Sequence, residues 1–86
     1  MSNYRITLAR TAEKEITRLP SQIQERVARA IDSLAENPRS HDSKKLKGSA
    51  NVYRIRVGDY RVIYEINEKA KRVDVAHVRH RREAYD

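Results

Sequence analysis

The 86-residue chain contains no cysteine, tryptophan or phenylalanine, and only two glycines and two prolines. The lack of cysteine excludes a disulfide scaffold and a thiolate metal site, and it fits a reducing compartment. No apolar run approaches the roughly 20 residues that a membrane-spanning helix needs, and the first residues, MSNYRITLAR, lack the apolar core of a signal peptide. We therefore expect a cytoplasmic protein without membrane contact. It is expected to form one domain, residues 1–86, with a core of Ile, Val, Leu and Tyr side chains.

Positive charge is abundant but unevenly distributed. The formal net charge is +7; residues 1–43 carry 7 Lys/Arg and 6 Asp/Glu, whereas residues 44–86 carry 12 Lys/Arg and 6 Asp/Glu. A positive excess concentrated on one part of a fold is typical of proteins that bind a polyanion. The alternative is a basic surface that only keeps the protein in solution.

The hydrophobic pattern predicts a strand, two helices and then several strands. Residues 4–8 alternate as a short strand does. The segment ARTAEKEITRLP predicts a helix with Thr11 as N-cap, and a second helix with an apolar stripe follows Pro20 and ends at Asn37-Pro38. From residue 52 the period changes to two, which predicts strands to 57, over 60–66 and over 72–79, besides a short one around 45–47. The order indicates an α+β fold, in which a helix hairpin covers one face of a mainly antiparallel sheet of about four strands.

The stretch YRIRVGDYRVIYEI, residues 53–66, places like charges opposite each other. With Gly58-Asp59 as a two-residue hairpin turn, Arg56 pairs with Arg61, and both share a face with Arg54, away from the helices. Like charges in opposed positions destabilise a sheet, and such a broken rule is typical of a functional site. Guanidinium groups match phosphate oxygens in pairs. The cluster therefore predicts a phosphate-binding site, with a merely solvated charged face as the alternative.

The C-terminal segment HVRHRREAYD and a basic loop supply further candidates. Histidine is the side chain type that most readily transfers protons near neutral pH, which makes His80 a candidate for this role, although an exposed histidine in a basic tail is the more common case. Tyr85 can stack on a base or anchor the chain end. The other side chains expected to attract a polyanion are cationic: Lys44, Lys45, Lys47, Arg79, Arg81 and Arg82. The histidines and carboxylates do not have the spacing of a metal site, so we expect neither a metal nor a cofactor.

Several motifs, taken in order and with their spacing, resemble the RelE/ParE superfamily of toxins from bacterial and archaeal toxin–antitoxin pairs. They are Leu-Pro at 19–20, Asn-Pro at 37–38, KKLKGS, YRIRVGDYRVIYEI and the ending HRREAY, and the resemblance spans nearly the whole chain. It implies a RelE-like fold. It also implies a small antitoxin that wraps the toxin and blocks its basic face, with operator DNA bound only through that antitoxin.

The RelE branch implies a specific activity: cleavage of mRNA in the ribosomal A site, without a metal, which inhibits translation. The ribose 2′-OH attacks its adjacent phosphate and leaves a 2′,3′-cyclic phosphate. The expected partners of this endoribonuclease are therefore the ribosome and mRNA.

The family pattern assigns roles residue by residue. Arg54 and Arg56 match a basic pair on the first hairpin strand, and Arg61 matches an arginine at the scissile phosphate. Arg81 matches an arginine that is proposed to stabilise the leaving side, and Tyr85 matches a C-terminal tyrosine that stacks on or polarises the substrate. Characterised RelE members have lysines at positions 54 and 56, and arginine, unlike lysine, does not give up its proton. We therefore expect these two arginines to neutralise the phosphate while His80 or Tyr85 moves protons.

Two other functions are compatible with the sequence. ParE-like members share the fold but inhibit DNA gyrase; the clustered arginines favour RNA cleavage over this activity. The third possibility is a catalytically inactive homologue that serves only as an antitoxin-binding co-repressor. It is suggested by the chain ending one residue after Tyr85, without the longer C-terminal helix of some members.

Overall fold

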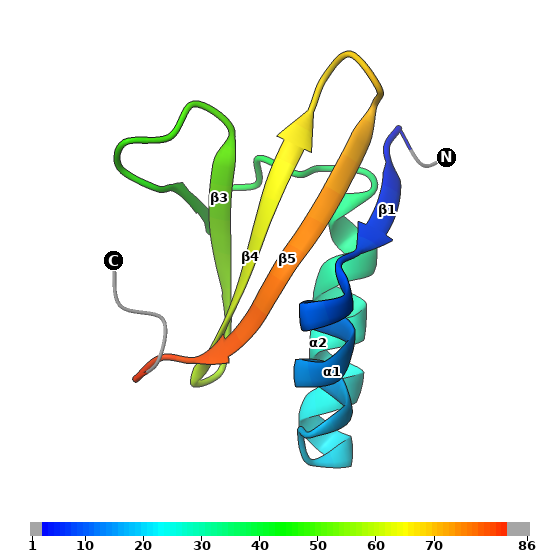
Figure 1. Cartoon of the computed structure of the whole chain (residues 1–86), viewed down its shortest axis with the longest axis vertical. Helices are drawn as coiled ribbons and strands as arrows, with labels where there is room; N and C mark the ends of the chain where they lie inside the picture. Colours follow the sequence, from blue (N-terminus) through cyan, green and yellow to red (C-terminus); the bar gives the residue numbers. More distant parts are fainter. Residues whose placement is uncertain (1–2, 83–86) are drawn as a thin grey trace.

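Two helices pack on one face of a five-stranded sheet in the computed structural model, which describes residues 3–82 (Figure 1). The elements, in chain order, are β1 (Arg5–Leu8), α1 (Arg10–Thr17), α2 (Ser21–Leu34), β2 (Ser43–Lys45), β3 (Val52–Val57), β4 (Tyr60–Asn67) and β5 (Arg72–His80). The strand order is β1-β5-β4-β3-β2. The pairing of β1 with β5 is parallel, and the other pairings are antiparallel.

The α+β architecture confirms the fold class predicted from the sequence, with one strand more than the four expected. The short strand β2 begins two residues earlier than its pattern indicated. The prediction of Thr11 as N-cap is wrong: α1 begins at Arg10, and Ala9 precedes it without a side-chain cap. The reason is tertiary, because the Ala9 N–H donates to the Val75 carbonyl at 2.9 Å. Backbone pairing with β5 thus continues to Ala9, and the helix starts immediately after it.

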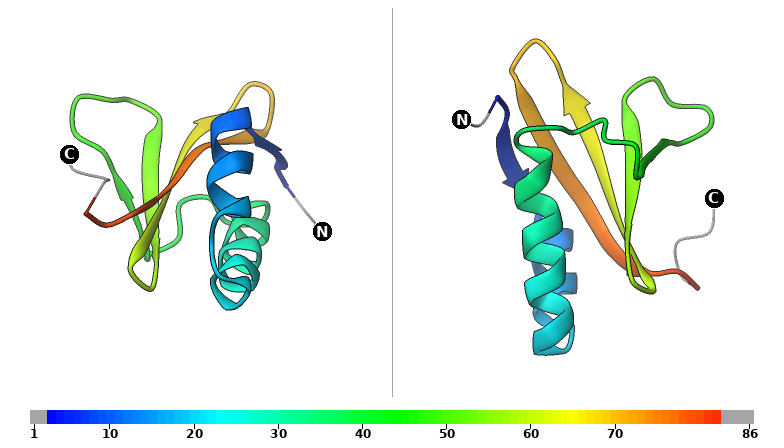
Figure 2. Two further views of the ribbon diagram at one scale, coloured as in Figure 1. Left: turned by 60° about the horizontal axis from the view of Figure 1, so that its bottom comes forward. Right: turned by 180° about the vertical axis from the view of Figure 1, so that it is seen from behind.

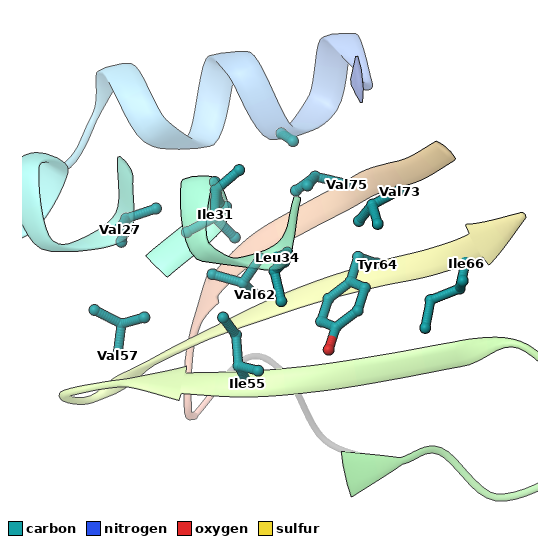
Figure 3. Close-up of a cluster of buried hydrophobic side chains, with 12 residues drawn as sticks. Val27, Ile31, Leu34, Ile55, Val57, Val62, Tyr64, Ile66, Val73 and Val75 are labelled. Carbon is teal, nitrogen blue, oxygen red and sulfur yellow. The ribbon is translucent and has the colours of Figure 1, made fainter. Parts of the chain in front are cut away.

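The hydrophobic core lies between the helices and the sheet (Figure 3). The apolar stripe of α2 contributes Val27, Ile31 and Leu34, all buried. The strands contribute Ile55, Val57, Val62, Tyr64, Ile66, Val73, Val75 and Val78. Each fully buried side chain of this size contributes about 1.5–3 kcal/mol relative to exposure. This burial holds both helices against a single face, and the opposite face, which we call the outer face, points away from them (Figure 2).

Tyr64 fixes the loop that follows α2. Its ring is fully buried, and its hydroxyl donates a hydrogen bond of 2.6 Å to the carbonyl of Pro38, which is also buried. Burial raises the pKa of the Tyr64 hydroxyl to about 12. The bond therefore ties the middle of the sheet to the connection between the helical layer and β2.

Replacing Tyr64 by Phe is expected to lower the free energy of unfolding by about 1–3 kcal/mol, because a buried carbonyl loses its donor. The loss should shrink above pH 10. The unfolded chain releases the phenolic proton near pH 10, whereas the folded chain holds it to about pH 12, so only the wild type loses this stabilisation as the pH rises. Urea denaturation between pH 7 and 11 measures both effects. Tyr53→Phe is the control, since its hydroxyl only accepts an exposed 3.4 Å bond from Arg39; equal losses in both variants would contradict the prediction.

Glu68 joins three separate segments at the other end of the sheet. Its carboxylate accepts hydrogen bonds from Arg39 of the α2–β2 loop, from the Tyr4 hydroxyl at 2.9 Å, and from Lys71 at 3.1 Å. Arg39 contributes most, and together these donors lower the pKa of Glu68 to about 2. The cluster links the chain before β1 to the β4–β5 turn.

Glu68→Gln is expected to destabilise the fold at neutral pH and to have little effect near pH 2. Because the folded-state pKa is depressed, the stabilisation is complete above the unfolded value of about 4.3 and disappears as the pH falls toward 2. The cluster is solvent-accessible, so 1 M salt should reduce the difference. Thermal unfolding from pH 2 to 7 measures it. Glu25→Gln, exposed on α2, is the control, and a pH-independent difference for the Glu68 variant would refute the assignment.

Candidate functional site

The β3–β4 hairpin places two arginines side by side. Val57 and Tyr60 flank the Gly58-Asp59 turn, and Arg56 is the direct partner of Arg61, which confirms the predicted register. Gly58 has a φ of +61°, and a Cβ at this position would lie 3.3 Å from the guanidinium of Arg26 on α2. The turn thus needs glycine for its backbone conformation, and it lies against the helical layer.

The outer face is basic at the end that carries this turn. One cross-strand row consists of Arg56, Arg61 and Arg79, contributed by β3, β4 and β5. The next row begins with Lys44 of β2, which pairs directly with Arg54. Opposed side chains in such rows have Cβ atoms about 5 Å apart. Five cations thus occupy two adjacent rows of one surface.

The same face becomes acidic further along the strands. The row beyond Arg54 contains Glu65 and Asp74, which are direct partners, and Asp74 also accepts a hydrogen bond from Thr7 on β1. Arg72 binds Asp74 at 2.7 Å. The outer face therefore divides into a basic end beside the Gly58-Asp59 turn and a largely neutralised, carboxylate-bearing end.

Four arginines line an open hollow of about 310 Å³ at the basic end: Arg56, Arg61, Arg81 and Arg82. We call it the arginine hollow. Arg81 follows β5, and its backbone N–H donates to the Asp59 carbonyl at 2.7 Å, which fastens this segment to the hairpin turn. Guanidinium groups stay charged at any physiological pH and bind phosphate oxygens bidentately. The arrangement suits an anion with several oxygens, such as a phosphodiester.

The cations predicted from the sequence are not all brought together. Arg54 and Lys44 lie in the row next to the arginine hollow. Lys45 pairs with Tyr53 and so shares the opposite face, whereas Lys47 is exposed in the loop after β2. Arg79 belongs to the row of Arg56 and Arg61 but contacts Glu15 of α1. Tyr85 lies outside the described residues.

The expectation that His80 shares the site with the arginines is not met. His80 pairs with Tyr60, whose side chain is on the helix-facing side of the sheet, and the two rings meet edge to face with centroids 5.3 Å apart. The His80 Nδ1 accepts a hydrogen bond of 3.3 Å from the Arg82 N–H. Because side chains alternate along a strand, His80 points to the opposite face from Arg79. It lines a second hollow, of about 380 Å³, between α1 and the ends of β4 and β5.

Sequence reasoning missed Glu15 and Arg26. Glu15 lies among the apolar positions of α1, three residues after buried Ala12 and four before Leu19. A carboxylate on the buried side of a helix is a signal of a specific partner, although the sequence does not identify that partner. Arg26 gives no such signal, because it is, like Arg29, an exposed cation on α2.

Two further observations concern metal ions and membranes. No group of three His, Asp or Glu side chains within residues 3–82 is arranged to hold a metal ion. In that same part of the chain, neither helix is long and apolar enough to cross a membrane.

The sequence matches known proteins along almost its whole length. The family model for the ParE toxin of the type II toxin–antitoxin system parDE matches residues 6–85. Toxin RelE3 of Methanocaldococcus jannaschii is 35% identical over 86 residues, covering 95% of this chain and 96% of that protein. Toxin RelE of Mycobacterium tuberculosis is 28% identical over 83 residues, covering 95% and 86% respectively.

Solved structures are similar in fold. The archaeal RelE–RelB complex from Pyrococcus horikoshii OT3 aligns with a TM-score of 0.81 and 32% identity, covering 95% of this chain and 99% of that one. The isolated E. coli RelE toxin aligns with a TM-score of 0.80 and 26% identity, covering 90% and 83%. The observed arrangement of two helices on a sheet is thus the fold of the RelE toxins.

Arg56→Gln and Arg81→Gln are each expected to elute from a heparin column at lower salt than the wild type, because each removes a cation from the arginine hollow. Arg29→Gln removes the same charge from an exposed position on α2, and should shift elution by less than half as much. Equal shifts for all three variants would mean that net charge, rather than the hollow, governs polyanion binding.

Proposed function

The chain belongs to the RelE/ParE superfamily of toxins of type II toxin–antitoxin systems, and from this premise we propose that it is a ribosome-dependent mRNA endonuclease. It cleaves mRNA in the ribosomal A site, in the cytoplasm, and thereby inhibits translation. The observation that carries the proposal is the arginine hollow, where four permanently charged side chains meet on a solvent-accessible surface. Phosphodiester cleavage needs such an arrangement, because negative charge accumulates on the phosphate oxygens in the transition state.

The proposed reaction is an intramolecular displacement. The ribose 2′-oxygen forms a bond to the adjacent phosphorus, the bond from phosphorus to the 5′-oxygen of the next nucleotide breaks, and a 2′,3′-cyclic phosphate remains. The 2′-OH loses a proton and the leaving 5′-oxygen gains one. Arg56 and Arg61, as cross-strand neighbours, bind the non-bridging oxygens, and Arg81 stabilises the leaving oxygen. Holding the 2′-oxygen in line supplies the rest of the acceleration.

The remaining cations bind the flanking RNA. Arg54 and Lys44 neutralise a neighbouring phosphate from the next row of the outer face, and Arg82 does so at the other side of the arginine hollow. Lys45 and Lys47 contribute long-range attraction. Arginine does not transfer protons at these pH values, and His80 faces the helical side. Tyr85 therefore stays the proposed proton-transfer and stacking residue.

A cognate antitoxin is the proposed protein partner. Related toxins have been solved in complexes with RelB from Pyrococcus horikoshii and E. coli. In this chain, the arginines of the cross-strand row repel one another, and an acidic partner bound over them would reduce this repulsion. We propose that the antitoxin covers the outer face and thereby excludes RNA from the arginine hollow, and that operator DNA is contacted through the antitoxin.

Induction of the chain alone in cells, followed by mapping of mRNA 5′ ends, tests the activity. Codon-phased cuts within translated regions are expected. Arg81→Gln should reduce cleavage about 100-fold or more, as loss of a transition-state donor does, whereas His80→Gln should retain most of it. Immunoblots for equal protein levels are the control. A large loss with His80→Gln would contradict the assignment of His80 to the helical side.

The match to the ParE family model favours a second candidate function, inhibition of DNA gyrase. The same induction experiment distinguishes the two. Trapped gyrase cleavage complexes without phased mRNA cuts would replace the nuclease assignment by gyrase inhibition. Unimpaired growth with intact mRNA would indicate an inactive homologue that acts as an antitoxin-binding co-repressor.

A further inference from the structure

The outer edge of β5 changes its partner halfway along the strand. β1 pairs with residues 72–75, and the Ala9 N–H still reaches the Val75 carbonyl. Beyond this point β5 contacts α1 instead, and the carboxylate of Glu15 binds the strand edge. Its Oε1 accepts a hydrogen bond of 2.9 Å from the Val78 N–H, and the His77 Nδ1 lies 3.5 Å from the same oxygen.

The second oxygen of this carboxylate holds Arg79. The distance from Arg79 Nε to Glu15 Oε2 is 3.1 Å, and the side chains are 38% and 21% exposed, respectively. Arg79 is the cross-strand partner of Arg61, yet it does not line the arginine hollow. Its side chain lines the second hollow, together with Glu15. The arginine at the β5 end of the basic row thus extends over the edge of the sheet, toward α1.

We propose that Glu15 is a positioning residue that keeps Arg79 out of the arginine hollow and so limits the number of cations that contact the RNA backbone. The inference rests on the proposed function to the extent that the hollow binds RNA phosphates. It assigns to α1 a part in substrate affinity, although α1 lies on the opposite side of the sheet from the bound RNA.

The physical basis is competition between two anions for one guanidinium. Charge-assisted hydrogen bonds from arginine to a partly buried carboxylate are stronger than those to solvated groups. If Arg79 joined the hollow, it would tighten binding of the substrate and of the transition state alike. Such uniform binding does not accelerate the chemical step. While Arg79 is bound to Glu15, only the arginines that line the hollow contact the RNA phosphate there, so substrate binding is not tightened by an additional cation.

Glu15→Gln separates the two interactions of this side chain, since it removes the ion pair with Arg79 and keeps the hydrogen bond to the edge of β5. The amide oxygen of glutamine still accepts the Val78 N–H. Its NH₂ group then faces the guanidinium of Arg79, and since both groups only donate hydrogen bonds, Arg79 is released. The arginine hollow is one cross-strand position away, within reach of the long side chain.

The test is the salt dependence of binding between the full chain and a short, 2′-O-methylated single-stranded RNA, measured by fluorescence anisotropy. One additional phosphate contact steepens the slope of log K against log salt by about 0.7, which corresponds to about fivefold tighter binding at about 0.1 M salt. We expect this change for Glu15→Gln. The double variant E15Q/R79Q should return to the wild-type slope.

Glu13→Gln is the matched control, because it makes the same change in net charge from an exposed position on the same helix. Its slope should equal that of the wild type. If Glu15→Gln and Glu13→Gln behave alike while Arg56→Gln flattens the slope, the hollow binds RNA and the role of Glu15 is refuted. If Arg56→Gln also leaves the slope unchanged, the proposed RNA site itself fails.

A comparison of Arg79→Gln with Arg56→Gln covers the case in which Glu15→Gln does not fold, as judged by circular dichroism. Sequestration predicts that Arg79→Gln flattens the slope by less than half as much as Arg56→Gln. Equal flattening would show that Arg79 contacts the RNA directly, which overturns the inference.

Discussion

The register of the β3–β4 hairpin is the constraint on which the rest of the structure depends. Gly58 supplies the positive φ of a two-residue turn, and the turn fixes which residues are opposed. A slip of one residue would turn the side chains of one strand to the other face. Arginines would then enter the core and apolar side chains would meet water. The repulsion between Arg56 and Arg61 is therefore tolerated because the register that buries Ile55, Val57 and Val62 is the one that opposes them.

The backbone groups at the edge of β5 are paired in two different ways. A parallel strand covers the first half of this edge, and a helix with one carboxylate covers the second. Glu15 satisfies a backbone N–H that would otherwise be an unpaired donor at a sheet edge. The same side chain binds Arg79, so that one residue both pairs with the edge of β5 and positions a cation of the outer face. A substitution at position 15 is therefore expected to change the charge distribution of the outer face as well as the stability of the fold.

The hairpin, α2 and the grouping of Arg54, Arg56 and Arg61 followed from the sequence, because each depends on local patterns of period and turn chemistry. The parallel pairing of β1 with β5 did not, since it joins residues more than sixty positions apart. For the same reason Ala9, rather than Thr11, precedes α1. Proximity in the sequence groups His80 with Arg79 and Arg81, whereas alternation along β5 turns His80 to the opposite face from Arg79, and His80 and Arg81 line different hollows. Glu15 was visible only as a misplaced charge, because its partners lie in a distant strand.

The division of the outer face into a basic and a carboxylate-bearing end has a directional consequence. A uniformly negative ligand is attracted to the row of Arg56 and Arg61 and repelled by Glu65, which lies four residues, or two rows, further along β4. Net attraction alone would let a polyanion slide along the strands in many registers. The change in charge along the face instead limits this sliding, since a phosphate that moves past the arginines meets Glu65 and a largely neutralised surface. The charge distribution on the outer face therefore favours one position of a polyanion along the strands.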